Sequence, residues 1–240
     1  MHHLYAEAHR LGITKPQITD TLSHLPLSPF MIQALHHIKH HGRADILILS
    51  DANTVFIETL LEAHQVRHLV SRIITNPAQF DDQGRLHIRR RIRPGLDQPH
   101  GCQTGTCSLN ICKGRELVNV KEEGPNIYET VVYVGDGRND FCPSLQLTAT
   151  DHVLVRKGRT LERMMLEHRP SLRDLVRGDV GAVVAPDDVQ TVGTPMVRRK
   201  VRANVHFWSD AAEALDLFRV IFPERSANDP PSALSSTESL

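Results

Sequence analysis

Residues 131–140 read Val-Val-Tyr-Val-Gly-Asp-Gly-Arg-Asn-Asp, and this stretch is the most informative part of the chain about its fold. Four β-favouring residues in a row predict a strand covered on both faces, and Gly135 and Gly137 let the chain turn sharply where that strand ends. Asp136 and Asp140 follow the carboxyl end of the strand, where open α/β sheets bind ligands. Carboxylate oxygens suit Mg²⁺, so the pattern favours a magnesium site. An ordinary strand-turn-helix with Asn139 or Asp140 as a helix cap is the alternative.

Size and charge limit the classes of protein to consider. The chain has 240 residues, enough for one α/β domain with a modest insertion or for two small domains. Lys plus Arg and Asp plus Glu balance at 28 each, so no overall field attracts nucleic acid or an acidic membrane. Apolar runs such as Ile46–Leu49 are far too short to span a bilayer. We expect a soluble cytoplasmic protein with no nucleic-acid or membrane partner.

Strand-like and helix-like segments alternate along the chain. Ser28 and Pro29 predict a helix start, followed at helical spacing by apolar residues. Strands are predicted at residues 45–50, 70–75, 131–134 and 152–155, with helices at 54–63, 112–122, from 139, from 160 and at 208–222. This alternation predicts an α/β fold with a doubly wound parallel sheet.

Two segments fall outside that alternation. Residues 81–101 are polar and basic and contain Gly and Pro, so they predict a loop or an exposed hairpin, with the Arg89–Arg91 run as a solvated face. Residues 223–240 are rich in Ser and Pro and predict a disordered tail.

Cys102, Cys107 and Cys112 are crowded together, with four residues in each gap. They do not form a secreted disulfide framework in a chain this large. Reduced thiols are the simplest interpretation. A zinc site with His100 as the fourth ligand and a disulfide remain open alternatives.

Polar residues stand after predicted strands or at a helix start, in the order Ser50, Lys113 and Asp136 with Asp140. Phosphoryl transfer needs a hydroxyl and backbone amides for phosphate oxygens, a cation for developing charge, and carboxylates for Mg²⁺. Taken singly, a strand-end serine is usually a helix cap and a lysine is usually solvated. Their order and spacing together favour a phosphoryl-transfer site.

Five segments carry a family resemblance: Pro26–Pro29, Leu49–Thr54, Asn76–Pro77, Asn110–Gly114 and Tyr133–Pro143. They resemble the haloacid dehalogenase superfamily of phosphatases, and within it the phosphoethanolamine/phosphocholine phosphatase family and its pyridoxal-phosphate phosphatase-like relatives. The resemblance implies a Rossmann-like sheet, with residues 27–222 as the core and residues 1–26 as the remnant of a helical cap.

The same resemblance implies roles for individual residues. Ser50 would be the phosphate-binding hydroxyl, Lys113 the cation that stabilises the phosphoryl intermediate, and Asp136, with Asp140 close by, the Mg²⁺ carboxylates. Asp51 would face the leaving group, where a carboxylate discriminates in favour of amine cations. The alternative for Asp51 is a turn former whose side chain bonds its own backbone.

The family's first motif, Asp-x-Asp-x-Thr, does not occur in these 240 residues. In the family its first Asp attacks phosphorus and its second is the general acid and base. We therefore expect a fragment or truncated product that lacks the family's first strand, and whose neighbouring strands lack a ladder partner. Asp51–Thr54 imitates the motif, with Asp51 as nucleophile, but Asn53 cannot exchange a proton as a carboxyl does.

The function predicted from the sequence is a Mg²⁺-dependent phosphomonoesterase for phosphocholine, phosphoethanolamine or pyridoxal phosphate. Its partner is a small phosphorylated metabolite, and the chain as written is expected to be inactive. One alternative is a non-catalytic product that binds phosphate, Mg²⁺ or a protein. Another is a module stabilised by zinc at the cysteine cluster.

Overall fold

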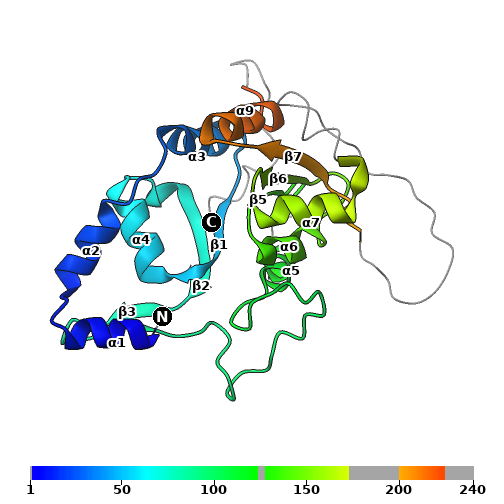
Figure 1. The fold of residues 1–240 in the computed structure, drawn as a ribbon. Helices are drawn as coiled ribbons and strands as arrows, with labels where there is room; N and C mark the ends of the chain where they lie inside the picture. The colour runs from blue at the N-terminus through cyan, green and yellow to red at the C-terminus, as the bar shows by residue number, and fades with distance from the viewer. Residues whose placement is uncertain (1, 124–127, 173–199, 225–240) are drawn as a thin grey trace, which may run out of the picture.

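The computed structural model describes residues 2–123, 128–172 and 200–224, which form a mixed α/β structure with parallel sheets (Figure 1). The helices are α1 (His2–Arg10), α2 (Lys15–Ser23), α3 (Pro29–His41), α4 (Thr54–Ala63), α5 (Lys113–Glu123), α6 (Phe141–Ser144), α7 (Thr160–His168) and α9 (Ala211–Ile221). None of the helices described is long and apolar enough to cross a membrane.

The parallel strands form two separate sheets. β1 (Ile46–Asn53) pairs with β2 (Val70–Asn76), and β5 (Val132–Gly135), β6 (His152–Arg156) and β7 (Asn204–Trp208) pair in that order. Each predicted strand is therefore present, and parallel pairing is confirmed.

A third sheet lies between β2 and α5 in the sequence. β3 (Ala78–Phe80) and β4 (Leu86–Ile88) form a short antiparallel hairpin. A hairpin was one of the two alternatives predicted for residues 81–101, but only its second strand and its turn lie there, because the first strand ends at Phe80.

Helices cover both faces of the β5–β7 sheet, because β6 is apolar on both sides. Val153 and Val155 pack into one cluster with Leu161 of α7. Leu154 points the other way, into a cluster with Ala34 of α3 and residues of α9. In Figure 1, α3 and α9 lie side by side on one side of this sheet and α7 on the other. This arrangement agrees with a Rossmann-like core.

One edge of β1 and one edge of β5 have no strand partner among the residues described, because β1 pairs only with β2 and β5 only with β6. Val134, within β5, is 40% exposed, and residues 46–52 of β1 are only half-buried. The prediction that the Val131–Val134 strand is covered on both faces is wrong for Val134, since among the described residues β5 has a neighbouring strand only on its β6 side.

The predicted helix at residues 208–222 starts too early. Trp208 ends β7 instead of lying on a helix face, and α9 begins at Ala211. Asp210 determines this boundary, because its side chain accepts hydrogen bonds from the N–H groups of Ala212 and Glu213. The strand before it was not predicted from the sequence.

The N-terminal helices pack on the rest of the structure, α1 against β4 and α2 against α4. Thr14 caps α2 in a reciprocal arrangement with Gln17. That residues 1–26 are a cap remnant stays a prediction. The predicted tail at residues 223–240 lies almost wholly outside the described residues.

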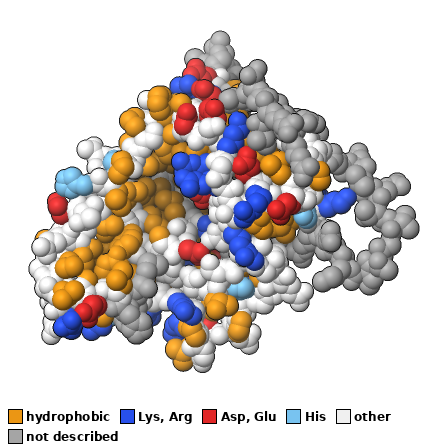
Figure 2. Space-filling view, viewed as in Figure 1, with side chains coloured by type: hydrophobic (Ala, Val, Ile, Leu, Met, Phe, Trp, Pro, Cys, Tyr) orange, Lys and Arg blue, Asp and Glu red, His pale blue; other side chains and the backbone are white. Residues whose placement is uncertain are grey.

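Charges of both signs are interspersed over the face seen in Figure 2, whereas hydrophobic side chains gather toward α2 and α4. This surface agrees with the equal numbers of acidic and basic residues in the sequence.

Candidate active site

Ser50 and Asp51 lie where β1 departs from regular pairing, since its register with β2 shifts after Leu49. Asn76, at the end of β2, stabilises this irregular part of β1. Its Nδ2 donates to the carbonyl oxygens of Asp51 and Ala52, both at 2.8 Å. The Ser50 hydroxyl oxygen accepts from the Ala52 N–H at 3.1 Å. Irregularities of this kind re-aim side chains beside active sites.

The Asp51 carboxylate reaches two distant segments. Its Oδ2 accepts from the Ser108 hydroxyl at 2.9 Å and from the side-chain amide of Asn139. Its Oδ1 is buried and has no hydrogen-bond partner among the described residues. The side chain therefore does more than form a turn with its own backbone, and a buried oxygen without a partner calls for an explanation.

Lys113 is the first residue of α5, and its side chain is only 11% exposed. Its Nζ donates to Oδ1 of Asp140 at 2.7 Å, and the Tyr133 hydroxyl donates to the same oxygen at 2.7 Å. Oδ2 of Asp140 accepts from the N–H groups of Asp136 and Gly137 at 3.0 and 2.8 Å. Both carboxylate oxygens of Asp140 are thus bonded within the protein.

These contacts determine the protonation of Asp140 and Tyr133. Burial raises the pKa of Asp140, but the charge and hydrogen bond of Lys113, with the other donors, outweigh it and lower that pKa below its ordinary value. Burial and the Asp140 charge raise the pKa of Tyr133 well above its ordinary value. An ionised Asp140 therefore holds a hydroxyl donor and a lysine in fixed positions.

Asp136 differs from Asp140 in its surroundings. Its side chain is exposed at the end of β5, and no hydrogen bond to its carboxylate is found among the described residues. A free carboxylate there fits Mg²⁺, which keeps several waters and takes few protein ligands. Asp140, with its oxygens already bonded, fits the role of positioning Lys113. The assignment of both as metal ligands stays a prediction.

Glycine is required where Asp140 folds back on the strand. A Cβ at Gly135 would lie 2.6 Å from the Cβ of Asp140, too close for two carbon atoms. The first glycine of the motif therefore allows the close approach that brings Asp140 onto the turn.

We expect Asp140→Asn to lower the free energy of unfolding by about 3 kcal/mol at pH 7, because it leaves buried Lys113 without its counter-charge. The folded pKa of Asp140 is lowered, so its contribution is present above the unfolded value of about 3.9 and is lost as pH falls through the folded value. Urea denaturation at several pH values measures both effects.

Asp216→Asn is the matched control, since Asp216 pairs with Arg219 at the surface. It should change the free energy of unfolding by less than about 0.5 kcal/mol. A similarly small change for Asp140→Asn would show that the buried pair does not hold the site together.

Hydrogen bonds connect the segments that carry Asp51, Asp136, Asp140 and Lys113, and Ser50 adjoins them as the residue before Asp51. The Asp51–Asn139 hydrogen bond links the ends of β1 and β5, and Asn139 immediately precedes Asp140, which binds Lys113. No role was predicted from the sequence for Asn76 or Ser108, and Asn139 was considered only as a helix cap. Asn76 and Asn139 lie inside the segments that carry the family resemblance, so the sequence offered a signal for them. Ser108 lies in an irregular loop, and no sequence pattern indicated its role.

The Arg89–Arg91 run is only partly a solvated face. Arg91 forms a two-pronged ion pair with Glu116 of α5, and its backbone N–H donates to Oδ1 of Asn76. The hydrogen bonds that Arg91 donates to Glu116 raise the pKa of Arg91 above its ordinary value. The prediction is wrong for Arg91, because the loop turns back onto α5 at that residue.

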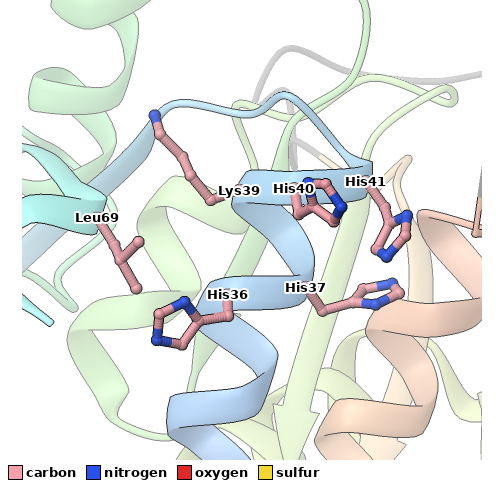
Figure 3. Close-up of a pocket in the computed structure, with 6 residues that line it drawn as sticks. All are labelled: His36, His37, Lys39, His40, His41 and Leu69. Atoms are coloured by element: carbon pink, nitrogen blue, oxygen red, sulfur yellow. The ribbon is translucent and has the colours of Figure 1, made fainter.

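A hollow on the surface over α3 is lined by His36, His37, Lys39, His40, His41 and Leu69 (Figure 3). Its histidines do not converge: His36 points toward Leu69, whereas His37 and His41 lie together on the side facing α9. His37 Nε2 lies 2.7 Å from the Phe222 carbonyl oxygen. The hollow shares no residue with the network around Lys113 and is not part of the candidate active site.

The chain is similar to several known proteins. Over 163 residues the chain is 36% identical to "Probable phosphatase phospho1" of Danio rerio, covering 65% of this chain and 56% of that protein. It is 33% identical to "Pyridoxal phosphate phosphatase PHOSPHO2" of Bos taurus, covering 64% and 62%, and 35% identical to "Inorganic pyrophosphatase 1" of Arabidopsis thaliana, covering 66% and 53%. The chain thus spans between about half and two thirds of the length of these relatives.

A family model described as "Putative Phosphatase" matches residues 1–180. The matched region contains every residue of the network described above. The chain therefore belongs to this family, the haloacid-dehalogenase-like group that its motifs resemble.

Proposed function

We propose that this chain carries the phosphate- and metal-binding part of a Mg²⁺-dependent phosphomonoesterase whose substrate is a small phosphorylated metabolite. The buried Lys113–Asp140 pair is the observation that carries the proposal, because it fixes a cation beside the polar ends of β1 and β5. Relatives named as phosphatases of pyridoxal phosphate and of pyrophosphate support the same class of chemistry.

Each residue has a chemical task in this proposal. The Ser50 hydroxyl and the neighbouring backbone N–H groups hold phosphate oxygens. Lys113 offsets the charge that develops on the transferred phosphoryl group, and Asp140 keeps the lysine in place. Asp136 would hold Mg²⁺, which supplies further positive charge to the phosphate oxygens when bound.

The attacking carboxylate is proposed to come from a strand that is not among these residues. β1 and β5 each have an unpaired edge in the described part of the chain, and their ends are connected through Asp51 and Asn139. A parallel strand between them would satisfy both edges and would bring its terminal side chains to the same end of the sheet. An Asp-x-Asp-x-Thr motif at that end would complete the site.

The proposal is tested in an extended chain, in which the first-motif segment of a family member is joined upstream of residue 1. This extended chain should hydrolyse phosphomonoesters in the presence of Mg²⁺. If it folds and shows no hydrolysis of any small phosphomonoester with Mg²⁺, the non-catalytic alternative is favoured, in which the chain only binds phosphate, Mg²⁺ or a partner.

Asp51 is proposed to determine substrate class, because its buried Oδ1 has no hydrogen-bond partner in the described part of the chain and lies beside the proposed phosphate site. We expect Asp51→Asn in the extended chain to reduce turnover of phosphocholine and phosphoethanolamine more than that of an uncharged aryl phosphate. A partly exposed charge pair contributes roughly 1–2 kcal/mol, or about 5- to 30-fold in the ratio of kcat/KM values. An asparagine can still accept from Ser108 and Asn139 through its carbonyl oxygen.

Asp45→Asn is the control for this measurement, since Asp45 lies before β1 and accepts hydrogen bonds from Ser71 and Tyr128. It should leave the selectivity ratio unchanged. Equal losses on all substrates in the Asp51 variant would assign Asp51 to the general phosphate site and would remove the basis for an amine preference.

A further inference from the structure

Four cysteines meet beside the candidate active site. Cys102, Cys107 and Cys112 are joined by Cys142 of α6, and the four Sγ atoms lie within 4.8 Å of one another. All four are free thiols, two of them buried. Among the described residues this is the one group of cysteine, histidine and carboxylate side chains placed closely enough to hold a metal ion.

The spacing of the sulfur atoms matches a tetrahedral metal site. The Sγ–Sγ distances are 3.5 Å for the pairs 102–142, 102–107 and 107–112, and 3.7 Å for the pair 112–142. Four sulfurs at about 2.3 Å from a central zinc are about 3.8 Å apart. A disulfide would require about 2.05 Å, so none of these pairs is bonded.

His100 is not the fourth member of this cluster. Its Nδ1 accepts from the Cys102 N–H at 3.0 Å, and its Nε2 lies 3.0 Å from the Ser108 carbonyl oxygen. Both ring nitrogens are therefore engaged in holding the loop. The candidate ligand set from the sequence thus had the wrong fourth residue, because Cys142 lies 30 residues beyond Cys112 and only the fold brings them together.

A glycine and a backbone donor shape the cluster. At Gly114 a Cβ would lie 2.6 Å from the Cys142 sulfur, so the absence of a side chain lets α5 and α6 pack closely enough for Cys112 to reach Cys142. The Arg115 N–H lies 3.4 Å from the Cys112 sulfur and donates to it. Backbone donors to ligand atoms are typical of the surroundings of metal sites.

The loop that carries three of these thiols needs a stabilising element. Residues 89–112 contain no helix or strand apart from an isolated bridge between Ser108 and Ile111. Irregular loops of that length are uncommon inside compact domains unless they are functional or fixed in place. A metal bound by thiolates at Cys102, Cys107, Cys112 and Cys142 would tie this loop to α5 and α6 at one point.

From this geometry we propose that the four cysteines bind one structural Zn²⁺. Four thiolate ligands leave no open position, so the ion has no catalytic role. Each thiol that binds loses its proton, and metal binding stabilises the folded state by the free energy of binding. The proposal does not depend on the phosphatase assignment.

The zinc also accounts for the position of the candidate active-site residues. Cys112 immediately precedes Lys113, and Cys142 lies two residues after Asp140. The tied loop also carries Ser108, which donates to Asp51. The metal therefore fixes both members of the buried ion pair and one of the donors to Asp51 from a single point.

The test is the metal content of the 240-residue chain purified with a reductant and without chelators, determined by mass spectrometry. We expect about one zinc per chain in the wild type, and its loss in Cys142→Ser. His100→Ala and Asp136→Asn should each retain the zinc, which separates this site from the alternative histidine ligand and from the proposed Mg²⁺ site. Cobalt exchanged into the wild type should show the thiolate-to-metal absorption of a tetrahedral four-sulfur site.

The wild-type measurements keep the proposal falsifiable even if a cysteine variant fails to fold. Folded wild-type protein that contains no zinc and does not take up cobalt would overturn it, as would a disulfide between any two of the four cysteines. Loss of zinc in His100→Ala together with retention in Cys142→Ser would overturn the ligand set.

Discussion

Lys113→Ala should reduce kcat/KM of the extended chain by about 10²-fold or more, the scale on which loss of one charge-stabilising group acts. Asp140 holds the ammonium group at 2.7 Å, and the Lys113 side chain is only 11% exposed, so alanine removes a positive charge that has a fixed position. Steady-state kinetics on an uncharged aryl phosphate measures this loss, because that substrate has no amine cation for Asp51 to recognise.

Arg115→Ala is the matched control, because Arg115 lies two residues after Lys113 on α5 and is exposed. Among the described residues, the one hydrogen bond of its side chain goes to the His100 carbonyl oxygen. Its kcat/KM should stay near the wild-type value. Circular dichroism must show that the Lys113 variant is folded, since the substitution also leaves Asp140 without its cation. A folded Lys113→Ala variant with near-wild-type activity would show that the lysine is structural only.

Asp136→Asn should remove most of the activity of the extended chain, because a neutral amide is a much poorer Mg²⁺ ligand than a carboxylate. The Asp136 carboxylate makes no hydrogen bond among the described residues, so the substitution should have little effect on stability. Activity measured across a range of Mg²⁺ concentrations separates weaker metal binding from a lost catalytic step.

Near-wild-type turnover of Asp136→Asn at saturating Mg²⁺ would place the metal elsewhere. The Asp81→Asn variant provides the control, since Asp81 is an exposed carboxylate in the β3–β4 hairpin region, paired with His87. Its activity and its Mg²⁺ dependence should match those of the wild type.

Local sequence signals predicted most of the fold. Pro29 correctly predicted the start of α3. Asp210 caps α9, but this capping signal was not used, and the helix was predicted to start earlier, at residue 208. Trp208 was assigned to a helix because its spacing from Ala212 and Leu215 fits helical periodicity, although it ends a strand. Short apolar runs beside helices are ambiguous for this reason.

The site was predicted less completely than the fold, because its contacts join residues far apart in the chain. Lys113 and Asp140 were selected from their own motifs, but only the structure shows that they bind each other. Cys142 belongs to a family segment, yet nothing in its spacing connects it with Cys102. Contacts between distant residues that are brought together by an irregular loop leave no periodic pattern in the sequence, so they could not be predicted from it.

The central claim is that these 240 residues hold phosphate and Mg²⁺ but lack the attacking carboxylate, and one comparison tests it most directly. Hydrolysis of phosphocholine, phosphoethanolamine and pyridoxal phosphate is measured for the chain alone and for the extended chain, under identical Mg²⁺ concentrations. We predict turnover by the extended chain and none by the chain alone. Turnover by the chain alone within about tenfold of the extended chain would contradict the claim, and would make Asp51 the nucleophile to test.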